Sequence, residues 1–317
     1  MGGGNIGIEE ARELGKVEIR EIPFLLAEAD SIRRQFQGGA VHLCSIMNAR
    51  SGRCSEDCSY CAQSVYHRTG IDVYPLRDSA EISRQALAAE AAGVSHFSIV
   101  ISGRGMDEAD ENETFDRIIQ VCRDIKDKTR LKLCASLGSL TLEQARRLKK
   151  VGVERYHHNV ETSRDYYPSI CRTHSYTDRI RTINVAREAG LAVCCGGIIG
   201  LGETLEQRLD MAFELRDMKI DCVPVNILNP VVGTLLEKAV PLPPLEILKT
   251  LAIFRFILPQ AIIRTAGGRE KNLRELQPMA LLGGVNGMLV GGYLTTTGRD
   301  SQLDFKMIED LGLQVFG

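Results

Sequence analysis

Residues 130–160 read RLKLCASLGSLTLEQARRLKKVGVERYHHNV, in which two apolar segments flank one charged amphipathic segment. The outer segments, residues 130–138 and 154–160, have the length and apolar character of buried strands. Residues 141–152 between them have the period of an amphipathic helix and end at Gly152, a residue type common just after a helix. The stretch therefore predicts a strand, a crossover helix and a second strand parallel to the first.

The same alternation continues through most of the chain. Further β-rich segments lie at residues 41–47, 96–102, 191–200, 222–228, 261–268 and 287–292, and amphipathic segments separate several of them. Strands that alternate with helices in this number predict an α/β fold, a TIM-type (β/α)8 barrel, with an open doubly wound sheet as the alternative. We expect residues 1–38 to form an N-terminal helical extension, and residues 39–317 to form the barrel and its C-terminal region.

The composition argues for a cytoplasmic protein. The 317 residues carry a formal net charge of −2, which predicts neither a nucleic acid partner nor binding to an anionic membrane. No apolar run has the length of a membrane span, and the first residues contain no apolar signal core. Ten cysteines are many for such a protein. In a reducing compartment they indicate metal ligands or buried thiols rather than disulfides.

Polar and sulfur-containing side chains gather in and just after the predicted strands. In a (β/α)8 barrel the active site lies at the carboxyl ends of the strands. The residues concerned are Cys44, Cys134, His157, Asn159, Cys194, Cys195, Cys222, Asn226 and Arg264. Adjacent side chains of a strand point to opposite faces, so only one of Cys194 and Cys195 enters the barrel easily. We expect most of this set to face one chamber.

The loop after the first predicted strand contains three closely spaced cysteines. Residues 48–64 read NARSGRCSEDCSYCAQS and place thiols at Cys54, Cys58 and Cys61. Structural zinc sites use four ligands, whereas a four-iron cluster held by three thiolates keeps one iron free. A zinc site completed by a distant histidine, or three unconnected buried thiols, is the alternative. The C-x3-C-x2-C spacing, with Tyr60 before the last cysteine, resembles the radical S-adenosylmethionine (SAM) superfamily.

A second, more specific resemblance covers residues 41–297. The segments SGRCSEDCSYCAQS, YHHNVETS, VCCGGIIGLGET, CVPVNIL, IIRTAGGRE and GYLTTTGR together resemble the biotin synthase family. The resemblance implies a 4Fe–4S cluster whose free iron binds SAM, and electron transfer that cleaves SAM to a 5′-deoxyadenosyl radical. It implies sulfur insertion into dethiobiotin, with an auxiliary iron–sulfur cluster deeper in the barrel as the sulfur donor. It also implies a homodimer and a low-potential electron donor, flavodoxin or ferredoxin.

The resemblance assigns roles to individual residues. The matches to ligands of the SAM-cleaving cluster are Cys54, Cys58 and Cys61. The matches to cofactor-binding positions are Tyr60, Asn159, Glu161, Arg179, Gly196, Gly197 and Ile198. His157 and Asn226 match positions that bind the substrate. Glu161 and His157 depart from the better-known members of the family, which carry Asp and Asn at these positions.

The auxiliary cluster is where the chain departs most from the family. Its better-known members hold a two-iron cluster with three cysteines and an arginine, and Cys134, Cys194 and Arg264 match three of these ligands. Ser98 stands at the remaining cysteine position, and a hydroxyl is a poor ligand beside thiolates. Two cysteines are gained where those members carry serines. We therefore expect an all-thiolate, 4Fe–4S-type auxiliary cluster held by Cys44, Cys134, Cys194 and Cys222.

With that ligand set, Arg264 becomes a charge partner of an anionic cluster. We expect a biotin synthase with such a cluster to be adapted to strictly anaerobic cells. Cys195 is then expected to face the helices, and no role is assigned to Cys171. Two other functions remain open. One is a related radical enzyme that acts on another small molecule, similar to hydrogenase-cofactor maturases or the mutase that makes methylornithine. The other is a non-catalytic iron–sulfur electron carrier or sensor.

Overall fold

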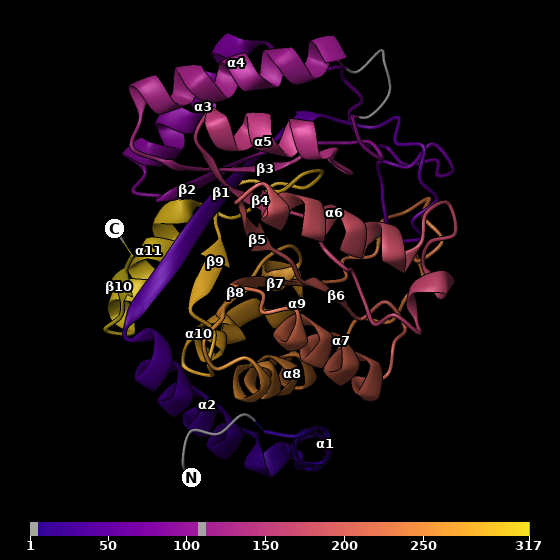
Figure 1. Ribbon diagram of the computed structural model, residues 1–317. Helices are drawn as coiled ribbons and strands as arrows, with labels where there is room; N and C mark the ends of the chain where they lie inside the picture. The colour runs from indigo at the N-terminus through magenta and orange to yellow at the C-terminus, as the bar shows by residue number, and fades with distance from the viewer. Residues whose placement is uncertain (1–5, 107–111, 317) are drawn as a thin grey trace.

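The computed structural model describes residues 6–106 and 112–316. Its centre is a closed barrel of parallel strands surrounded by helices (Figure 1). The barrel strands are β1 Ala40–Arg50, β2 His96–Ile101, β3 Lys132–Ser136, β4 Val153–His157, β5 Ala192–Cys194, β6 Gly197–Ile199, β7 Cys222–Ile227, β8 Ile262–Thr265 and β9 Gly287–Leu289. The barrel closes where β9 pairs with β1, with Leu43 opposite Met288. The predicted TIM-type barrel is confirmed.

One position in the barrel is filled by two short strands. β5 and β6 both pair with β7, with Cys194 opposite Cys222 and Gly197 opposite Val225. They are two halves of one interrupted strand, so the barrel has the eight strand positions that the sequence predicts. A further short strand, β10 Gln314–Val315, lies outside this ring and pairs with the start of β1.

Helices cover the outside of the barrel (Figure 1). After β1 they are α3 Ser79–Ala91, α4 Asn112–Lys128, α5 Leu142–Lys150, α6 Tyr176–Glu188, α7 Leu205–Asp217 and α8 Pro244–Ile257. Capping residues set several of their starts. At α5, Thr141 Oγ1 accepts a hydrogen bond from Gln144 N–H at 3.2 Å, and the Gln144 side chain accepts from Thr141 N–H at 3.0 Å. This capping box satisfies two backbone donors that the helix itself leaves unpaired.

Helix α8 is apolar on most sides because other helices cover it. The N-terminal helices α1 Ile8–Gly15 and α2 Ile22–Gln37 pack against α8, and so does α7. Its fully buried Arg255 donates hydrogen bonds to the carbonyl oxygens of Gly284 and Ala261, so these N–H groups are satisfied within the core. The division of the chain into an extension of residues 1–38 and a separate barrel domain stays a prediction.

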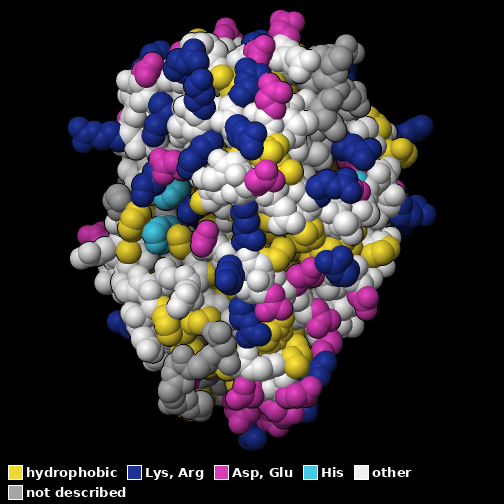
Figure 2. All heavy atoms as spheres, viewed as in Figure 1, with side chains coloured by type: hydrophobic (Ala, Val, Ile, Leu, Met, Phe, Trp, Pro, Cys, Tyr) yellow, Lys and Arg dark blue, Asp and Glu magenta, His cyan; other side chains and the backbone are white. Residues whose placement is uncertain are grey.

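Shorter helices complete the described chain. They are α9 Arg269–Leu273, α10 Gln277–Leu281 and α11 Ser301–Asp310, together with 3-10 helices at Ile19–Glu21, Tyr167–Ser169 and Arg274–Leu276. Figure 2 shows acidic and basic side chains interspersed over one face of the molecule, with acidic groups gathered at its lower end near the N-terminal helices. Among the described helices, none has both the length and the apolarity needed to cross a membrane.

Candidate active site

A cavity of about 430 Å³ lies within the barrel and opens at the carboxyl ends of its strands. The loop that follows β1 forms part of its wall, and residues inside the strands form its deeper part. The predicted site residues that line it are Cys44, Cys54, Cys58, Tyr60, Cys61, Cys134, His157, Asn159, Glu161, Arg179, Cys194, Ile198, Asn226 and Arg264. The three-cysteine loop and the thiols of the barrel interior therefore share one space.

Backbone hydrogen bonds shape the three-cysteine loop. Cys54 N–H donates to the Gln63 carbonyl at 2.9 Å, and Cys61 N–H donates to the Cys58 carbonyl at 3.0 Å. The Gln63 side chain also accepts from Gly52 N–H at 3.1 Å. Burial raises the pKa of the Cys61 thiol to about 11 and raises the pKa of Cys54 as well. These thiols are therefore protonated near neutral pH, and a positively charged metal centre would displace their protons.

Asn159, Glu161 and Arg179 form a connected polar group in the cavity wall. Arg179 Nη1 lies 3.5 Å from Glu161 Oε1 and donates to the Asn159 carbonyl at 3.1 Å. Asn159 Nδ2 donates to Glu161 Oε2 at 3.3 Å. Glu161 has a left-handed backbone with φ of 71°, a conformation that is rare for non-glycine residues and is enriched at functional sites. The group offers a carboxylate, an amide and a guanidinium to a ligand that carries amino and carboxylate groups.

Gly196 and Gly197 allow neighbouring backbone segments to approach closely. A Cβ atom at Gly196 would lie 1.9 Å from the Pro224 carbonyl oxygen, and one at Gly197 would lie 2.4 Å from the Glu161 carbonyl oxygen. Neither glycine lines the cavity, whereas Ile198 does. The structure therefore gives both glycines a packing role between strands, and their contact with a cofactor stays a prediction.

Four thiols from four strands converge inside the barrel. Cys44 lies on β1, Cys134 on β3, Cys194 on β5 and Cys222 on β7. Cys194 Sγ and Cys222 Sγ are 3.3 Å apart, although Cys222 is fully buried behind the cavity surface and does not line it. Cys195, the neighbour of Cys194, packs within the main apolar core instead. The opposite orientation of adjacent strand residues explains this difference.

Two arginines place unpaired N–H groups against these thiols. Arg264 Nε and Nη2 and Arg155 Nε and Nη1 are buried, and none of them has a hydrogen-bond partner within residues 6–106 and 112–316. Buried donors without partners are costly, so an anionic group in the chamber would satisfy them. Arg155 was not among the predicted site residues, although it lies two residues before His157 on β4 and therefore shares its face.

Proton sharing and burial set the charge of the chamber. The hydrogen bond between Cys194 and Cys222 raises the pKa of Cys194 and lowers the pKa of Cys222. Burial raises the pKa of Cys134 to about 12. For Arg264, burial lowers the pKa but electrostatic interaction with the surrounding cysteines outweighs it, so the pKa is raised and the side chain stays charged. Soft sulfur ligands beside fixed positive charge fit an anionic iron–sulfur cluster.

His157 and Asn226 line the same cavity from β4 and β7. Burial and the charge of Arg264 lower the pKa of His157 to about 4, so its neutral ring has one donor and one acceptor nitrogen. Asn226 Oδ1 accepts from Gly267 N–H at 2.9 Å, and Asn226 Nδ2 donates to the Gly197 carbonyl at 3.3 Å. These backbone contacts hold the amide in place and leave one of its N–H groups for a ligand.

Comparison with known proteins defines the class of this barrel. The Radical SAM superfamily matches residues 49–215, and the Biotin and Thiamin Synthesis associated domain matches residues 224–314. A crystal structure of methylornithine synthase has a TM-score of 0.86 and 19% identity, covering 99% of this chain and 95% of that chain. The FeFe-hydrogenase maturase HydG from Carboxydothermus hydrogenoformans has a TM-score of 0.82 and 20% identity, covering 99% of this chain and 76% of the maturase chain. The barrel and its three-cysteine loop are those of a radical SAM protein.

Sequence relatives define the family within that class. The chain is 51% identical over 314 residues to biotin synthase from Clostridium acetobutylicum, covering 99% of this chain and 95% of the relative. It is 48% identical over 315 residues to biotin synthase from C. hydrogenoformans, covering 99% of this chain and 96% of the relative. The chain belongs to the biotin synthase family, as the sequence motifs predict. The similarity to methylornithine synthase and the hydrogenase maturase, at about 20% identity, shows a common fold only.

Proposed function

We propose that this chain is a biotin synthase, which uses SAM to insert sulfur into dethiobiotin. The observation that carries the proposal is the single cavity lined both by the three-cysteine loop and by Cys44, Cys134 and Cys194. Joining a carbon radical to sulfur requires the radical source, the substrate carbon and the sulfur donor in one space that excludes water. The identity of about half of all residues to curated biotin synthases over nearly the full chain supports this reading.

The first ligand set would bind the SAM-cleaving cluster. Cys54, Cys58 and Cys61 are suited to a 4Fe–4S cluster with one open iron. With SAM bound, this cluster supplies a radical that abstracts hydrogen from unactivated C–H groups. The residues proposed to position SAM are Tyr60, Asn159, Glu161, Arg179 and Ile198. Among these, Arg179 complements the carboxylate of the cofactor, and Glu161, one methylene longer than aspartate, complements its amino or ribose groups.

The second ligand set would bind the auxiliary cluster that donates sulfur. Cys44, Cys134, Cys194 and Cys222 supply four thiolates, which is the ligand count of a 4Fe–4S-type cluster. Arg264 would balance the negative charge of this cluster through its unpaired N–H groups rather than bind iron. Such a cluster could carry an additional sulfide for transfer, which would leave its iron core intact.

Substrate binding falls to polar groups between the two ligand sets. Asn226, oriented by its contacts with backbone groups, has an N–H left for the ureido carbonyl of dethiobiotin. The neutral His157 ring would complete this recognition from β4. Electron supply by flavodoxin or ferredoxin, assembly as a homodimer and a place in the cytoplasm are further parts of the proposal, and they follow from the family resemblance.

The test is an anaerobic assay of the reconstituted protein with SAM, dithionite and dethiobiotin, in which 5′-deoxyadenosine and biotin are quantified by mass spectrometry. We expect both products. If 5′-deoxyadenosine forms without biotin, the radical chemistry holds and the substrate is a different small molecule. If neither forms in protein that carries both clusters, the proposal fails.

A further inference from the structure

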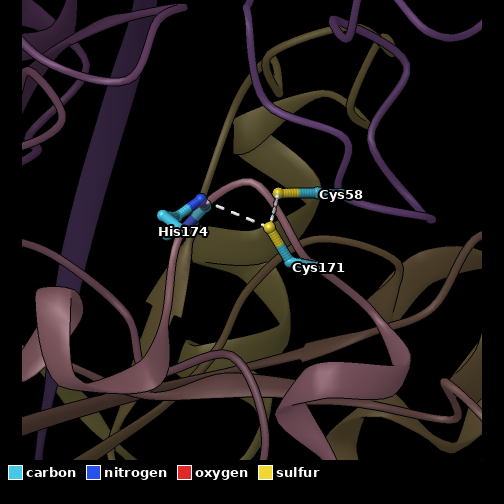
Figure 3. A group of neighbouring side chains, drawn as sticks. All are labelled: Cys58, Cys171 and His174. Carbon is cyan, nitrogen blue, oxygen red and sulfur yellow. Dashed lines mark hydrogen bonds between the residues drawn. The ribbon is translucent and has the colours of Figure 1, made fainter.

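A cysteine with no assigned role lies against the three-cysteine loop. Cys171 follows the 3-10 helix Tyr167–Ser169, and Figure 3 shows its sulfur between Cys58 and His174. Cys171 Sγ is 3.7 Å from Cys58 Sγ and 3.2 Å from His174 Nδ1. The ligand atoms of these three residues all lie within 4.8 Å of one another, and both cysteines are buried. Three ligating side chains from two distant segments therefore meet at one point.

The distances between these atoms match those of a tetrahedral metal site. Zn–S bonds of about 2.3 Å and Zn–N bonds of about 2.0–2.1 Å place two sulfur ligands about 3.8 Å apart, and a sulfur and a nitrogen about 3.5 Å apart. The corresponding distances here are 3.7 Å and 3.2 Å. One ion thus fits between the three atoms after small movements of side chains. A cubane cluster differs, because each of its thiolates binds a separate iron.

Neighbouring residues hold these ligands in the orientation that a metal requires. Tyr167 Oη is 2.7 Å from His174 Nε2 and accepts a hydrogen bond from Arg179 Nε at 2.8 Å. When Nδ1 faces a metal, the Nε2–H of His174 therefore has an acceptor, which is the usual arrangement for a metal-binding histidine. Glu56 Oε2 contacts His174 Nδ1, and Asp57 Oδ1 lies 3.3 Å from Cys171 Sγ. Either carboxylate can supply a fourth ligand and negative charge.

We propose that Cys58, Cys171 and His174 form a binding site for one soft divalent cation, such as Zn²⁺ or Fe²⁺, in chains that do not yet carry the SAM-cleaving cluster. The fourth ligand comes from Glu56 or Asp57. Binding of the ion releases the protons of the two thiols to solvent, and no electron is transferred. Two thiolates, an imidazole and a carboxylate form a donor set that zinc commonly takes.

The site competes with the cluster because both use Cys58. This competition depends on the proposed role of Cys58 as a cluster ligand. The binding of the ion does not depend on that role. An Fe²⁺ ion held by Cys58, Cys171 and His174 is placed for transfer into the loop during cluster assembly. A Zn²⁺ ion in the same place blocks assembly until it leaves.

The experiment is an anaerobic titration of the full-length, cluster-free chain with Co²⁺, followed by displacement with Zn²⁺. Thiolate-to-cobalt charge-transfer absorption and tetrahedral ligand-field bands report binding at this site. Because the barrel interior holds other thiols, the decisive quantity is the difference between variants. Cys171→Ala should remove one Co²⁺ equivalent or weaken its binding at least about tenfold. His174→Gln should weaken binding similarly and change the ligand-field bands.

Cys61→Ala is the matched control, because Cys61 belongs to the proposed cluster ligands but not to this site. It should keep the Co²⁺ equivalent that Cys171→Ala loses. A second measurement follows cluster assembly with iron and sulfide in the presence of one equivalent of Zn²⁺. Zn²⁺ should slow assembly in the unmodified chain and not in Cys171→Ala, whose fold is checked by circular dichroism. Equal Co²⁺ binding and equal spectra in the unmodified chain, Cys171→Ala and His174→Gln would overturn the proposal.

Discussion

Cys194 and Cys222 bring their Sγ atoms to within 3.3 Å of each other across strands β5 and β7. The two residues are paired in register, so the contact is set by the backbone of the barrel and not by a flexible loop. The hydrogen bond between them lowers the pKa of Cys222, and the positive charges of Arg264 and Arg155 lower it further. Two thiolates that each bind a separate iron must lie further apart than this, so at least one of the two side chains has to rotate when the proposed four-iron cluster binds.

Replacing one of these thiols should remove the auxiliary cluster and leave the SAM-cleaving cluster in place. Cys222→Ser should lower the iron content by about one four-iron cluster and abolish biotin formation, because a hydroxyl replaces a thiolate ligand. Production of 5′-deoxyadenosine should partly survive, since the three-cysteine loop is unchanged. Cys195→Ala is the control, because Cys195 packs in the core and not in the chamber. Full iron content and full sulfur transfer in Cys222→Ser and in Cys44→Ser would show that the all-thiolate site is wrong.

Arg179 should contribute directly to SAM affinity. Its guanidinium contacts Glu161 and the Asn159 carbonyl in the cavity wall. Arg179→Met removes a charge-assisted hydrogen-bond donor, and we expect binding of SAM to weaken roughly 10- to 100-fold. Isothermal titration of the cluster-loaded protein measures this change. Arg181→Met, at an exposed position on the same helix, is the control and should leave the affinity for SAM unchanged. Equal affinity of the two variants for SAM would show that Arg179 does not contribute to SAM binding.

The close approach of two strands at Gly196 should make this position intolerant of any side chain. A Cβ atom there would lie 1.9 Å from the Pro224 carbonyl oxygen. Gly196→Ala should therefore lower the free energy of unfolding by more than about 3 kcal/mol or prevent folding. Urea denaturation measures the effect, and Gly292→Ala, where no atom lies within 4 Å of the added Cβ, is the control. A Gly196→Ala chain as stable as the Gly292→Ala chain would contradict the tight packing of β5 and β7.

Four histidines whose pKa values are lowered in the folded chain should make stability depend on pH, and they are His42, His96, His157 and His158. Burial lowers the pKa of His42 to about 4 and that of His96 to about 3, from an ordinary value of 6.5. The unfolded chain therefore binds protons that the folded chain does not, and stability falls as the pH drops below about 6.5. Each histidine should contribute a slope of about 1.4 kcal/mol per pH unit.

Urea denaturation of the cluster-free chain between pH 7 and pH 5 tests this slope. His96→Gln should reduce it by about a quarter, because one of the four titrating histidines is removed. A stability that rises on acidification over this range, or a slope unchanged in His96→Gln, would contradict the neutral, buried state of these rings.

Local sequence patterns predicted most of the fold. The strand within residues 130–138 and the helix after it follow from the apolar segment and from the helical period that ends at Gly152, which act over a few residues. The interruption between β5 and β6 was not predicted, since residues 191–200 read as one apolar segment. At the break Gly196 lies so close to Pro224 of β7 that an added Cβ atom would be 1.9 Å from the Pro224 carbonyl oxygen, an approach between segments that the local sequence does not show.

The candidate site was predicted where motifs are contiguous and missed where partners are distant in sequence. Cys54, Cys58 and Cys61 lie in one loop, and their spacing is informative alone. Cys171 carries no local signal, because its partner Cys58 is 113 residues away. Arg155 was missed because a charged residue in a strand ordinarily faces solvent, and only the barrel shows that this one faces the thiols.

The proposed transfer of sulfur from a cluster inside the barrel to dethiobiotin can be tested with a heavy sulfur isotope. The chain is reconstituted with isotopically labelled sulfide, freed of excess sulfide, and turned over anaerobically with SAM, dithionite and unlabelled dethiobiotin. We predict that the biotin formed carries the heavy isotope and that Cys222→Ser, which keeps the three-cysteine loop, forms no labelled biotin. Biotin that contains only unlabelled sulfur, or labelled biotin from Cys222→Ser in normal yield, would contradict the account.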